Sequence, residues 1–229
     1  MGNHTPNHTL PSSVSGSCLL LLAICLPLSR SDCVAQGTAY TSRSDFNTVL
    51  TSSSMITFEE LPASDWLSVG TSPVITQGVT FTNFEHRLFI TAPSIIYPMP
   101  GAGQYLWNYD SSYPVGIYLP PGTTAFGADF NGGFQSQQTF NATLTAVLEG
   151  GQSYIYNFSG PGDSWTFFGL TFPEPIVSII YDDGGQFEPF GTHEEKLDNV
   201  SFGATIPEPS TSLIVLLGSV MVFCSRRRG

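Results

Sequence analysis

The sequence predicts an all-β protein whose body is an antiparallel, jelly-roll-like β-sandwich, and three observations lead to this fold class. Short segments that alternate between apolar and polar residues, or are rich in β-branched residues, recur along the chain. Turn signals containing glycine or proline, such as those at 120–122, 131–133 and 161–163, separate these segments. Helical periodicity is nearly absent. About ten strands at this spacing are typical of β-sandwiches and jelly rolls.

Residues 1–35 are predicted to be an export signal. Residues 18–28 form an apolar run of about the length of a signal-peptide core. Pro27 then breaks a helix, and Cys33-Val34-Ala35 offers a cleavage site of the small-x-small type before Gln36. The alternative, a membrane-spanning helix, is disfavoured because spanning takes about 20 apolar residues. We therefore expect a signal peptide over 1–35.

Residues 36–205 have the length of one domain. A helix is predicted over 44–50, with Ser44 as its N-cap and Phe46, Val49 and Leu50 on one face. The clearest hairpin joins 139–148 to 153–158 across a turn with two glycines. The full set of predicted strands is 55–59, 78–84, 87–91, 115–119, 123–130, 139–148, 153–158, 165–172, 176–181 and 199–202.

The predicted domain is strongly acidic and lacks cysteine. It carries 16 acidic residues against three basic ones, a net charge of −13. This charge repels nucleic acid and anionic membrane surfaces but is compatible with Ca²⁺ and neutral sugars. The cysteines are Cys18, Cys25, Cys33 and Cys224, all outside 36–205. We therefore expect no nucleic-acid partner, no disulfide and no thiolate chemistry in the domain.

Residues 206–229 combine a proline-rich turn, an apolar segment and an arginine cluster. The prolines discourage helix around Glu208, so a helix can begin only beyond Pro209. The predicted transmembrane segment, 212–225, has 14 residues and covers about 21 Å of a hydrocarbon core of roughly 30 Å. Bilayer thinning or snorkelling arginines would make up the difference. A plain single-pass anchor and a hydrophobic tail of no special kind are the alternatives.

This order of features resembles the PEP-CTERM sorting signal of exported bacterial proteins, over about a tenth of the chain. The resemblance implies an exosortase as processing partner, membrane attachment through the C-terminal helix before or without cleavage, and delivery to the cell surface or extracellular matrix. The sorting residues that it implies are Pro207, Glu208, Pro209, Arg226, Arg227 and Arg228.

The domain is similar to the sandwich common among PEP-CTERM proteins and to jelly-roll carbohydrate-binding modules. The motifs that carry this resemblance are 58–60, 78–81, 126–130, 165–169 and 197–202. In such modules an acidic residue of the first strand and an aspartate of the last strand often share a structural calcium ion. The resemblance thus implies Ca²⁺ at Glu59 or Glu60 with Asp198. Solvated strand-end carboxylates are the alternative. Asp182-Asp183-Gly184-Gly185 is a second calcium candidate, although a hairpin turn explains it adequately.

Aromatic residues suggest a ligand-binding surface. Tyr105, Trp107 and Tyr109 alternate in a loop-like stretch that also holds Asn108 and Asp110. Flat rings beside amide and carboxylate groups suit stacking on sugar faces and bonding to sugar hydroxyls. The same alternation describes a buried strand face, which is the interpretation we prefer.

Catalytic motifs are absent from the sequence. It contains no Gly-x-Ser-x-Gly elbow, no His-Glu-x-x-His helix and no glycine-rich phosphate loop. We therefore predict a non-enzymatic surface or matrix protein that binds exopolysaccharide. The alternative is a secreted glycan hydrolase on the same scaffold, for which Glu59 and Asp129 are a possible carboxylate pair.

Overall fold

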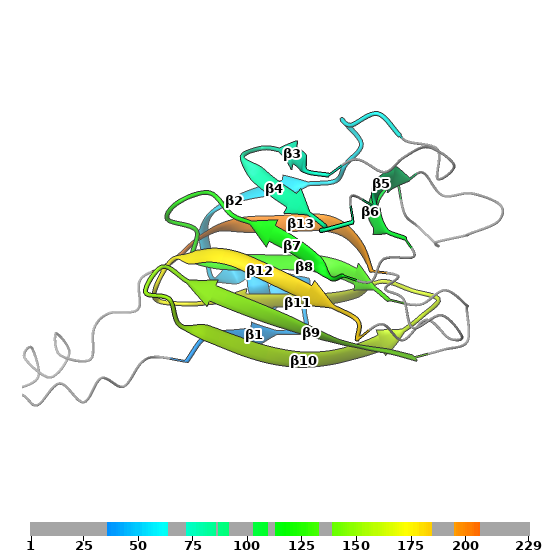
Figure 1. The fold of residues 1–229 in the computed structure, drawn as a ribbon. Coiled ribbons are helices and arrows are strands. Elements are labelled where there is room, and N and C mark those ends of the chain that lie inside the picture. The colour runs from blue at the N-terminus through cyan, green and yellow to red at the C-terminus, as the bar shows by residue number, and fades with distance from the viewer. Residues whose placement is uncertain are drawn as a thin grey trace, which may run out of the picture. The chain divides into compact units, whose positions relative to one another are not determined.

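The computed structural model describes residues 36–63, 72–85, 87–91, 103–109, 113–132, 139–184 and 195–206. These residues form two antiparallel β-sheets and one short helix (Figure 1). The predicted signal peptide and the sorting tail with its transmembrane segment lie outside the described residues. Within the described ranges, no helix combines the length and the apolar character that crossing a membrane requires.

The first sheet, sheet A, has seven strands, and β13 lies at its centre with β2, β6 and β8 as partners. Along the sheet the order is β1 (Thr38–Tyr40), β11 (Thr166–Thr171), β8 (Ala125–Asn131), β13 (Lys196–Thr205), β6 (Tyr105–Asn108) and β5 (Leu88–Thr91), and β2 (Leu50–Ile56) also pairs with β13.

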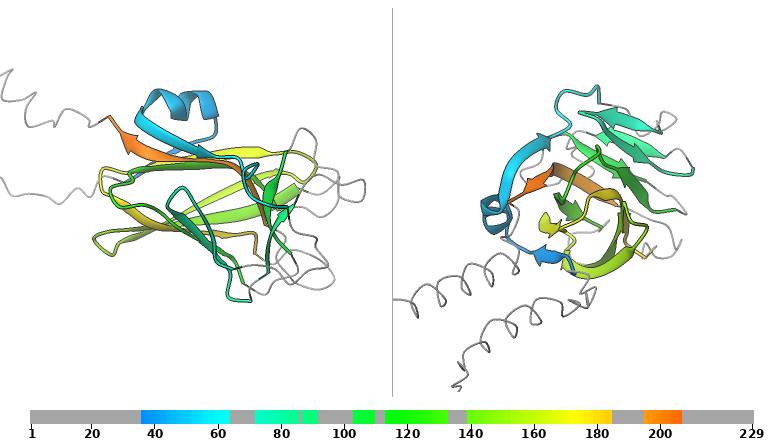
Figure 2. Two further views of the ribbon diagram at one scale, coloured as in Figure 1. Left: turned by 90° about the horizontal axis from the view of Figure 1, so that it is seen from above. Right: turned by 90° about the vertical axis from the view of Figure 1, so that its left-hand side faces the viewer.

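The second sheet, sheet B, has six strands and lies in front of sheet A in Figure 1. Its order is β10 (Ser153–Pro161), β9 (Thr139–Leu148), β12 (Ile176–Asp182), β7 (Val115–Tyr118), β4 (Val79–Thr82) and β3 (Val74–Thr76). The side views in Figure 2 show the two layers, with helix α1 (Arg43–Thr48) and β2 on the side of sheet A. The predicted antiparallel all-β architecture of two sheets is thereby confirmed.

The core fills the space between the sheets because the strands alternate apolar and polar residues. In β9 every second side chain from Phe140 to Leu148 is buried, while Asn141 and Thr139 are exposed. Aromatic rings join the sheets: the ring of Phe130 in β8 lies 4.8 Å from that of Tyr181 in β12 and 5.1 Å from that of Phe158 in β10. Such close ring contacts fix how the two layers pack.

The predicted helix is present but begins and ends earlier than expected. Its N-cap is Ser42, whose backbone is extended and whose hydroxyl oxygen accepts the Asp45 N–H at 3.4 Å, so the expectation of Ser44 as cap is wrong. Val49 is the C-cap and Leu50 already belongs to β2. Phe46 is fully buried, as expected for the apolar face.

The strand predictions are closest where the apolar alternation is long. The hairpin of β9 and β10 is confirmed, and β9 has the predicted bounds. The strand predicted over 55–59 instead runs from Leu50 to Ile56, because Phe58 adopts a positive φ of 62° and turns the chain. Glu59 and Glu60 therefore lie beyond the strand. Strands β1 and β3 were not predicted, and β6 was anticipated only by the aromatic alternation at 105, 107 and 109.

Candidate functional site

The structure brings Glu59 and Asp198 to the same part of sheet A. Strand β2 pairs with β13 with Ile56 opposite Val200, so the chain leaves β2 close to Asp198. Asp198 lies at a register shift in the pairing of β13 with β8 and is 4% exposed, whereas Glu59 is exposed. The negative charge of Glu59 is near enough to act on the Asp198 carboxyl. This proximity is what the predicted calcium site requires.

The Asp198 carboxyl group is held by its neighbour in the chain. The Asn199 backbone N–H donates to Oδ1 of Asp198 at 2.7 Å, and the Asn199 amide donates to Oδ2 at 3.3 Å. Burial raises the pKa of Asp198 from its ordinary value of 3.8 to about 6, and the charges of Asp129 and Glu59 add to this rise. The Asn199 N–H and the Arg43 guanidinium oppose it. Asp198 is therefore poised to gain a proton in mildly acidic solution.

A guanidinium group supplies positive charge beside this carboxyl. Arg43 of α1 forms an ion pair with Asp129 at 2.9 Å and donates to the hydroxyl of Ser201 and to the backbone carbonyl of Asn199. Its cationic group also lies 4.5 Å from the centre of the Phe167 ring. Arg43 thus ties α1 to β8 and β13. Asp129, the partner of Glu59 in the hydrolase alternative, is bound to a fixed cation.

The two adjacent glutamates have different partners. Glu59 accepts the backbone N–H of Gln104 at 2.6 Å, and Glu60 accepts the hydroxyl of Thr76 at 3.2 Å. Within the described part of the chain, Glu59, Glu60 and Asp198 are not among the groups of three carboxylates whose ligand atoms lie within 4.8 Å of one another. Calcium binding at these three residues stays a prediction.

The aromatic residues of the predicted sugar surface belong to β6, and all four residues of that strand are buried. Tyr105 is 0% and Trp107 is 1% exposed, while Tyr109 is half-buried. The Tyr105 ring packs edge-on against Trp165 and the Trp107 ring against Tyr109. Tyr105 and Trp107 are thus buried, as the preferred interpretation of a buried strand face predicts. Neither ring offers an exposed face to a sugar.

Sheet B carries a shallow depression on its outer face, with a volume of about 430 Å³. Cross-strand pairing places Asn157 opposite Thr143 and Thr143 opposite Asp182, which sets their outward side chains in one row. The depression is lined by Asn141, Ala142, Thr143, Asn157, Phe158, Ser159, Asp182 and Gly184. Sequence reasoning missed this site because its outward residues Asn141, Thr143, Asn157 and Ser159 look like ordinary strand residues until the strands are paired.

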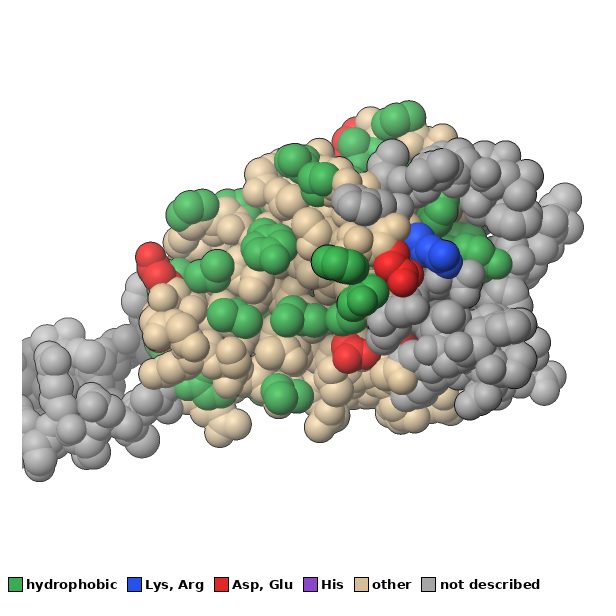
Figure 3. All heavy atoms as spheres, in the orientation of Figure 1, with side chains coloured by type: hydrophobic (Ala, Val, Ile, Leu, Met, Phe, Trp, Pro, Cys, Tyr) green, Lys and Arg blue, Asp and Glu red, His purple; other side chains and the backbone are tan. Residues whose placement is uncertain are grey.

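Apolar side chains cover the next part of the same face. Figure 3 looks onto this side of the molecule and shows hydrophobic side chains spread over sheet B. Ile155 of β10 and Ile180 of β12 lie in one cross-strand row with Thr145 between them. Tyr118 of β7 is 51% exposed and pairs with Ser178 of β12. Ser178 lies four residues before Asp182 in β12, so Tyr118 is about 13 Å along the strands from the depression. An exposed tyrosine at this distance can stack on another ring of a chain whose substituents bind amides and hydroxyls in the depression.

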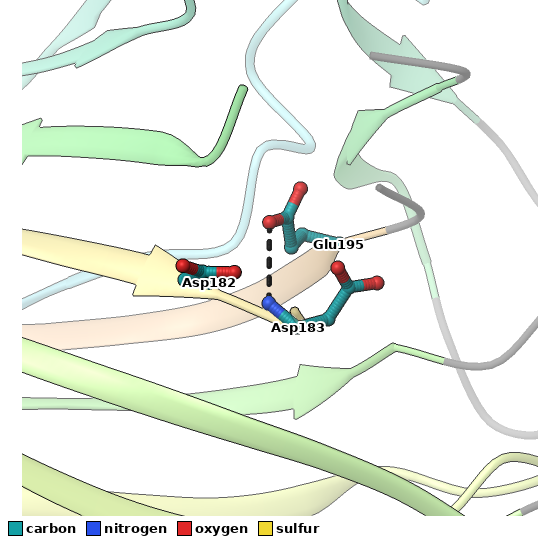
Figure 4. Close-up of side chains that lie close together, drawn as sticks. All are labelled: Asp182, Asp183 and Glu195. Carbon is teal, nitrogen blue, oxygen red and sulfur yellow. Dashed lines mark hydrogen bonds between the residues drawn. The ribbon is translucent and has the colours of Figure 1, made fainter. Parts of the chain in front are cut away.

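A cluster of three carboxylates lies where β12 ends and β13 begins. The carboxylate oxygens of Asp182, Asp183 and Glu195 are all within 4.8 Å of one another (Figure 4). Asp183 and Glu195 are buried and Asp182 is half-buried. The sequence marked Asp182 and Asp183 as a second calcium candidate. It gave no reason to add Glu195, because the spacing between Asp183 and Glu195 matches no metal-binding motif.

Comparisons with known proteins establish no family. No protein-family model matches the chain, and no curated protein matches it. One similar solved structure holds the CBM22-1 and GH10 modules of xylanase 10B from Clostridium thermocellum, complexed with xylohexaose. It is 11% identical with a TM-score of 0.36, and the match covers 60% of this chain and 28% of the xylanase chain. A likeness this weak carries no argument about function.

Proposed function

We propose that this chain is an exported, non-catalytic cell-surface or extracellular-matrix protein whose β-sandwich binds neutral exopolysaccharide on the outer face of sheet B. The observation that carries the binding proposal is the depression lined by amides and hydroxyls, on the same face of sheet B that exposes Tyr118 farther along the strands. We assign the sandwich to the jelly-roll type, because the chain from β7 to β13 alternates between sheets B and A except for the β9–β10 hairpin, which lies within sheet B.

The groups around the depression suit a neutral glycan. Asn141 and Asn157 each offer an amide that both donates and accepts, and Thr143 and Ser159 offer hydroxyls. Sugars present hydroxyl groups that need both kinds of partner. The chain has a net charge of −11, so an anionic glycan would be repelled unless cations screened it. A neutral polysaccharide meets no such barrier.

A binding measurement with the full chain tests this proposal. We expect retention on one or more neutral polysaccharides of a panel in affinity electrophoresis or calorimetry. The double variant Asn141→Ala/Asn157→Ala should bind at least about tenfold more weakly, because two buried amide contacts in the complex are each worth roughly 1 kcal/mol. The melting temperature should change little, since both side chains lie on the outer face.

A matched control removes an amide elsewhere. Asn47→Ala deletes an exposed amide on α1, on the side of sheet A, and should leave glycan binding unchanged. If no neutral polysaccharide binds, or if the double variant binds as well as Asn47→Ala, then the outer face of sheet B is not a glycan site.

We further propose that an exosortase-type enzyme sorts the chain through its C-terminal residues. The support is the sequence order of Pro207-Glu208-Pro209, an apolar segment and Arg226–Arg228. Mass spectrometry of the C-terminal peptide of the protein exported by its own cells tests this. A terminus at or next to 207–209 is expected. An intact terminus at Gly229 in the membrane fraction would mean a simple anchored protein.

The contacts of Asp129 support the proposal that the chain is not a hydrolase. In the hydrolase alternative Glu59 and Asp129 would act as a pair. Asp129 is occupied by the Arg43 ion pair at 2.9 Å and by the Asn199 amide at 2.9 Å. Both oxygens of Asp129 are thus engaged by protein groups. Release of reducing sugar from a polysaccharide that the chain binds, lost in Glu59→Gln, would contradict the proposal.

A further inference from the structure

The carboxylates of Asp182, Asp183 and Glu195 come from two different sheets. Asp182 ends β12 in sheet B, Asp183 follows it, and Glu195 immediately precedes β13 in sheet A. Figure 4 shows the side chains of the two aspartates and Glu195 gathered at this junction, with the Asp183 N–H directed at Oε1 of Glu195. Carboxylates of like charge repel, so their gathering here needs a reason beyond the acidic composition of the chain.

An amide oxygen lies beside this cluster without a hydrogen-bond donor. Asn108, at the end of β6, is fully buried, and its amide nitrogen donates to Oε2 of Glu195 at 2.5 Å and to the Tyr113 carbonyl at 2.9 Å. Both partners are acceptors, which fixes the orientation of the amide. Its Oδ1 is buried and has no hydrogen-bond partner. Because Oδ1 shares one carbon with the bonded nitrogen, it lies next to the Glu195 carboxylate.

A second buried oxygen at the cluster also lacks a partner. Tyr181 of β12 is 0% exposed, and its hydroxyl has no hydrogen-bond partner. Tyr181 directly precedes Asp182 and Asp183 in the chain. A buried hydroxyl and a buried amide oxygen that both lack a partner indicate a missing polar species in this part of the fold.

Backbone hydrogen bonds hold the groups of the cluster in place. Oδ1 of Asp182 accepts the Gly184 N–H at 2.6 Å, and the Glu195 carbonyl accepts the Asn108 N–H at 2.8 Å. The ammonium group of Lys196 bonds the amide oxygen of Asn131 at 3.4 Å and lies 5.8 Å from the centre of the Trp107 ring.

We propose that Asp182, Asp183, Glu195 and the amide oxygen of Asn108 bind a calcium ion. Three carboxylates and an amide oxygen are hard oxygen ligands, and Ca²⁺ accepts six to eight of them in flexible geometry with water completing the shell. Mg²⁺ is less suited, because it demands a near-ideal octahedron and gives up its waters reluctantly. The ion joins β12 of sheet B to β6 and β13 of sheet A, and this site differs from that of Glu59 and Asp198.

Calcium titration of the full chain tests this site by two readouts. We expect that Ca²⁺ at about 100 times its dissociation constant raises the melting temperature by roughly 5–10 °C over the value in chelator. We also expect Tb³⁺ bound in place of Ca²⁺ to emit when the nearby aromatic rings are excited, and Ca²⁺ to displace this emission. Equal melting shifts with Mg²⁺ would overturn the assignment to calcium.

Variants separate this site from other carboxylates. Asp182→Asn changes a half-buried side chain, so the protein should fold, and it should weaken Ca²⁺ binding at least tenfold. Glu195→Gln, which removes the central carboxylate, should abolish the terbium emission. The control Glu149→Gln removes an exposed carboxylate from the β9–β10 turn and should bind as the natural chain does. Calcium binding that survives Asp182→Asn and Glu195→Gln but is lost in Glu59→Gln or Asp198→Asn would overturn the proposal.

Discussion

At the residue scale, Asp198 shows how a buried carboxyl makes stability depend on pH. Its pKa is about 6 in the folded chain, against an ordinary value of 3.8. The folded state therefore binds the proton more tightly than the unfolded state does. Protonated Asp198 favours folding below about pH 4, and this contribution is lost as the pH rises through 6. Above pH 6 the carboxylate is charged in both states, and the folded state carries the full electrostatic cost.

Asp198→Asn should remove this pH dependence. Asparagine resembles the protonated carboxyl at every pH, so in chelator the variant should melt a few degrees higher than the natural chain at pH 8 and nearly equally at pH 4. Thermal melts at pH 4, 5, 6 and 8 check this. Asp163→Asn, in the exposed turn after β10, is the matched control and should keep the natural slope. Identical slopes in Asp198→Asn and the natural chain would show that Asp198 does not carry the effect.

The same variant tests the calcium site that the sequence predicts at Glu59 and Asp198. A calcium ion there would stabilise the charged form of Asp198 and reverse the sign of the substitution. In the presence of Ca²⁺, Asp198→Asn would then melt below the natural chain at pH 8. If the order of melting temperatures is the same with Ca²⁺ and with chelator, no ion binds at Asp198.

At the element scale, the β9–β10 turn depends on one glycine more than on its neighbour. Gly151 has a φ of +82°, in the left-handed region, and no atom lies within 4 Å of the position that a Cβ would take. Gly150 is not in that region, and the nearest atoms to a Cβ there belong to the carboxylate end of the flexible Glu174 side chain, which accepts the Gly150 N–H. A substitution at Gly151 therefore tests the backbone conformation, and a substitution at Gly150 tests the steric contact.

Gly151→Ala should destabilise the domain by about 1 kcal/mol, because an L-residue in the left-handed conformation costs 1–2 kcal/mol. Gly150→Ala should cost clearly less, since Glu174 can move aside. Urea unfolding of both variants checks the prediction, with unchanged m-values expected because the surface buried on folding stays the same. Equal destabilisation by the two changes would mean that the left-handed conformation of Gly151 is not what limits this turn.

Long regular alternation is what made elements predictable from the sequence. Residues 139–148 alternate over ten positions, and β9 has those bounds. Strand β6 has four buried residues in succession, so apart from the aromatic rings at 105, 107 and 109 it shows no alternation of apolar and polar residues. Strand β3 has only three residues. The end of β2 is set by the positive φ of Phe58, which no apolar pattern encodes.

The candidate sites were less predictable, because they depend on strand pairing. The resemblance to carbohydrate-binding modules implied that Glu59 lies near Asp198. In the structure β2 pairs with β13 with Ile56 opposite Val200, and a calcium site at Glu59 and Asp198 stays a prediction. Nothing in the sequence links Glu195 to Asp182 and Asp183, since they meet only after β12 and β13 have joined different sheets. The polar row of Asn157, Thr143 and Asp182 likewise exists only in the register of β10, β9 and β12.

At the scale of the whole molecule, the inner and outer faces of sheet B have separate roles. Tyr181 and Phe158 point to the inner side and contact Phe130 of sheet A, at ring distances of 4.8 and 5.1 Å. Tyr118 and Ile180 are exposed on the outer side. Substitutions on the inner face should therefore change stability, and substitutions on the outer face should change polysaccharide binding.

Phe130→Ala should destabilise the domain by about 3–5 kcal/mol, because it removes a fully buried ring at the contact between the sheets and leaves a cavity. Phe130→Leu should cost less and keep the chain folded enough for binding assays, with unchanged affinity for a neutral polysaccharide. Tyr118→Ala should show the opposite pattern, a stability change within about 1 kcal/mol and weaker polysaccharide binding. Denaturant unfolding and affinity electrophoresis on the same samples decide this. If Tyr118→Ala binds normally while Phe130→Leu does not, the ligand contacts something other than the outer face, and the division of roles between the faces of sheet B is wrong.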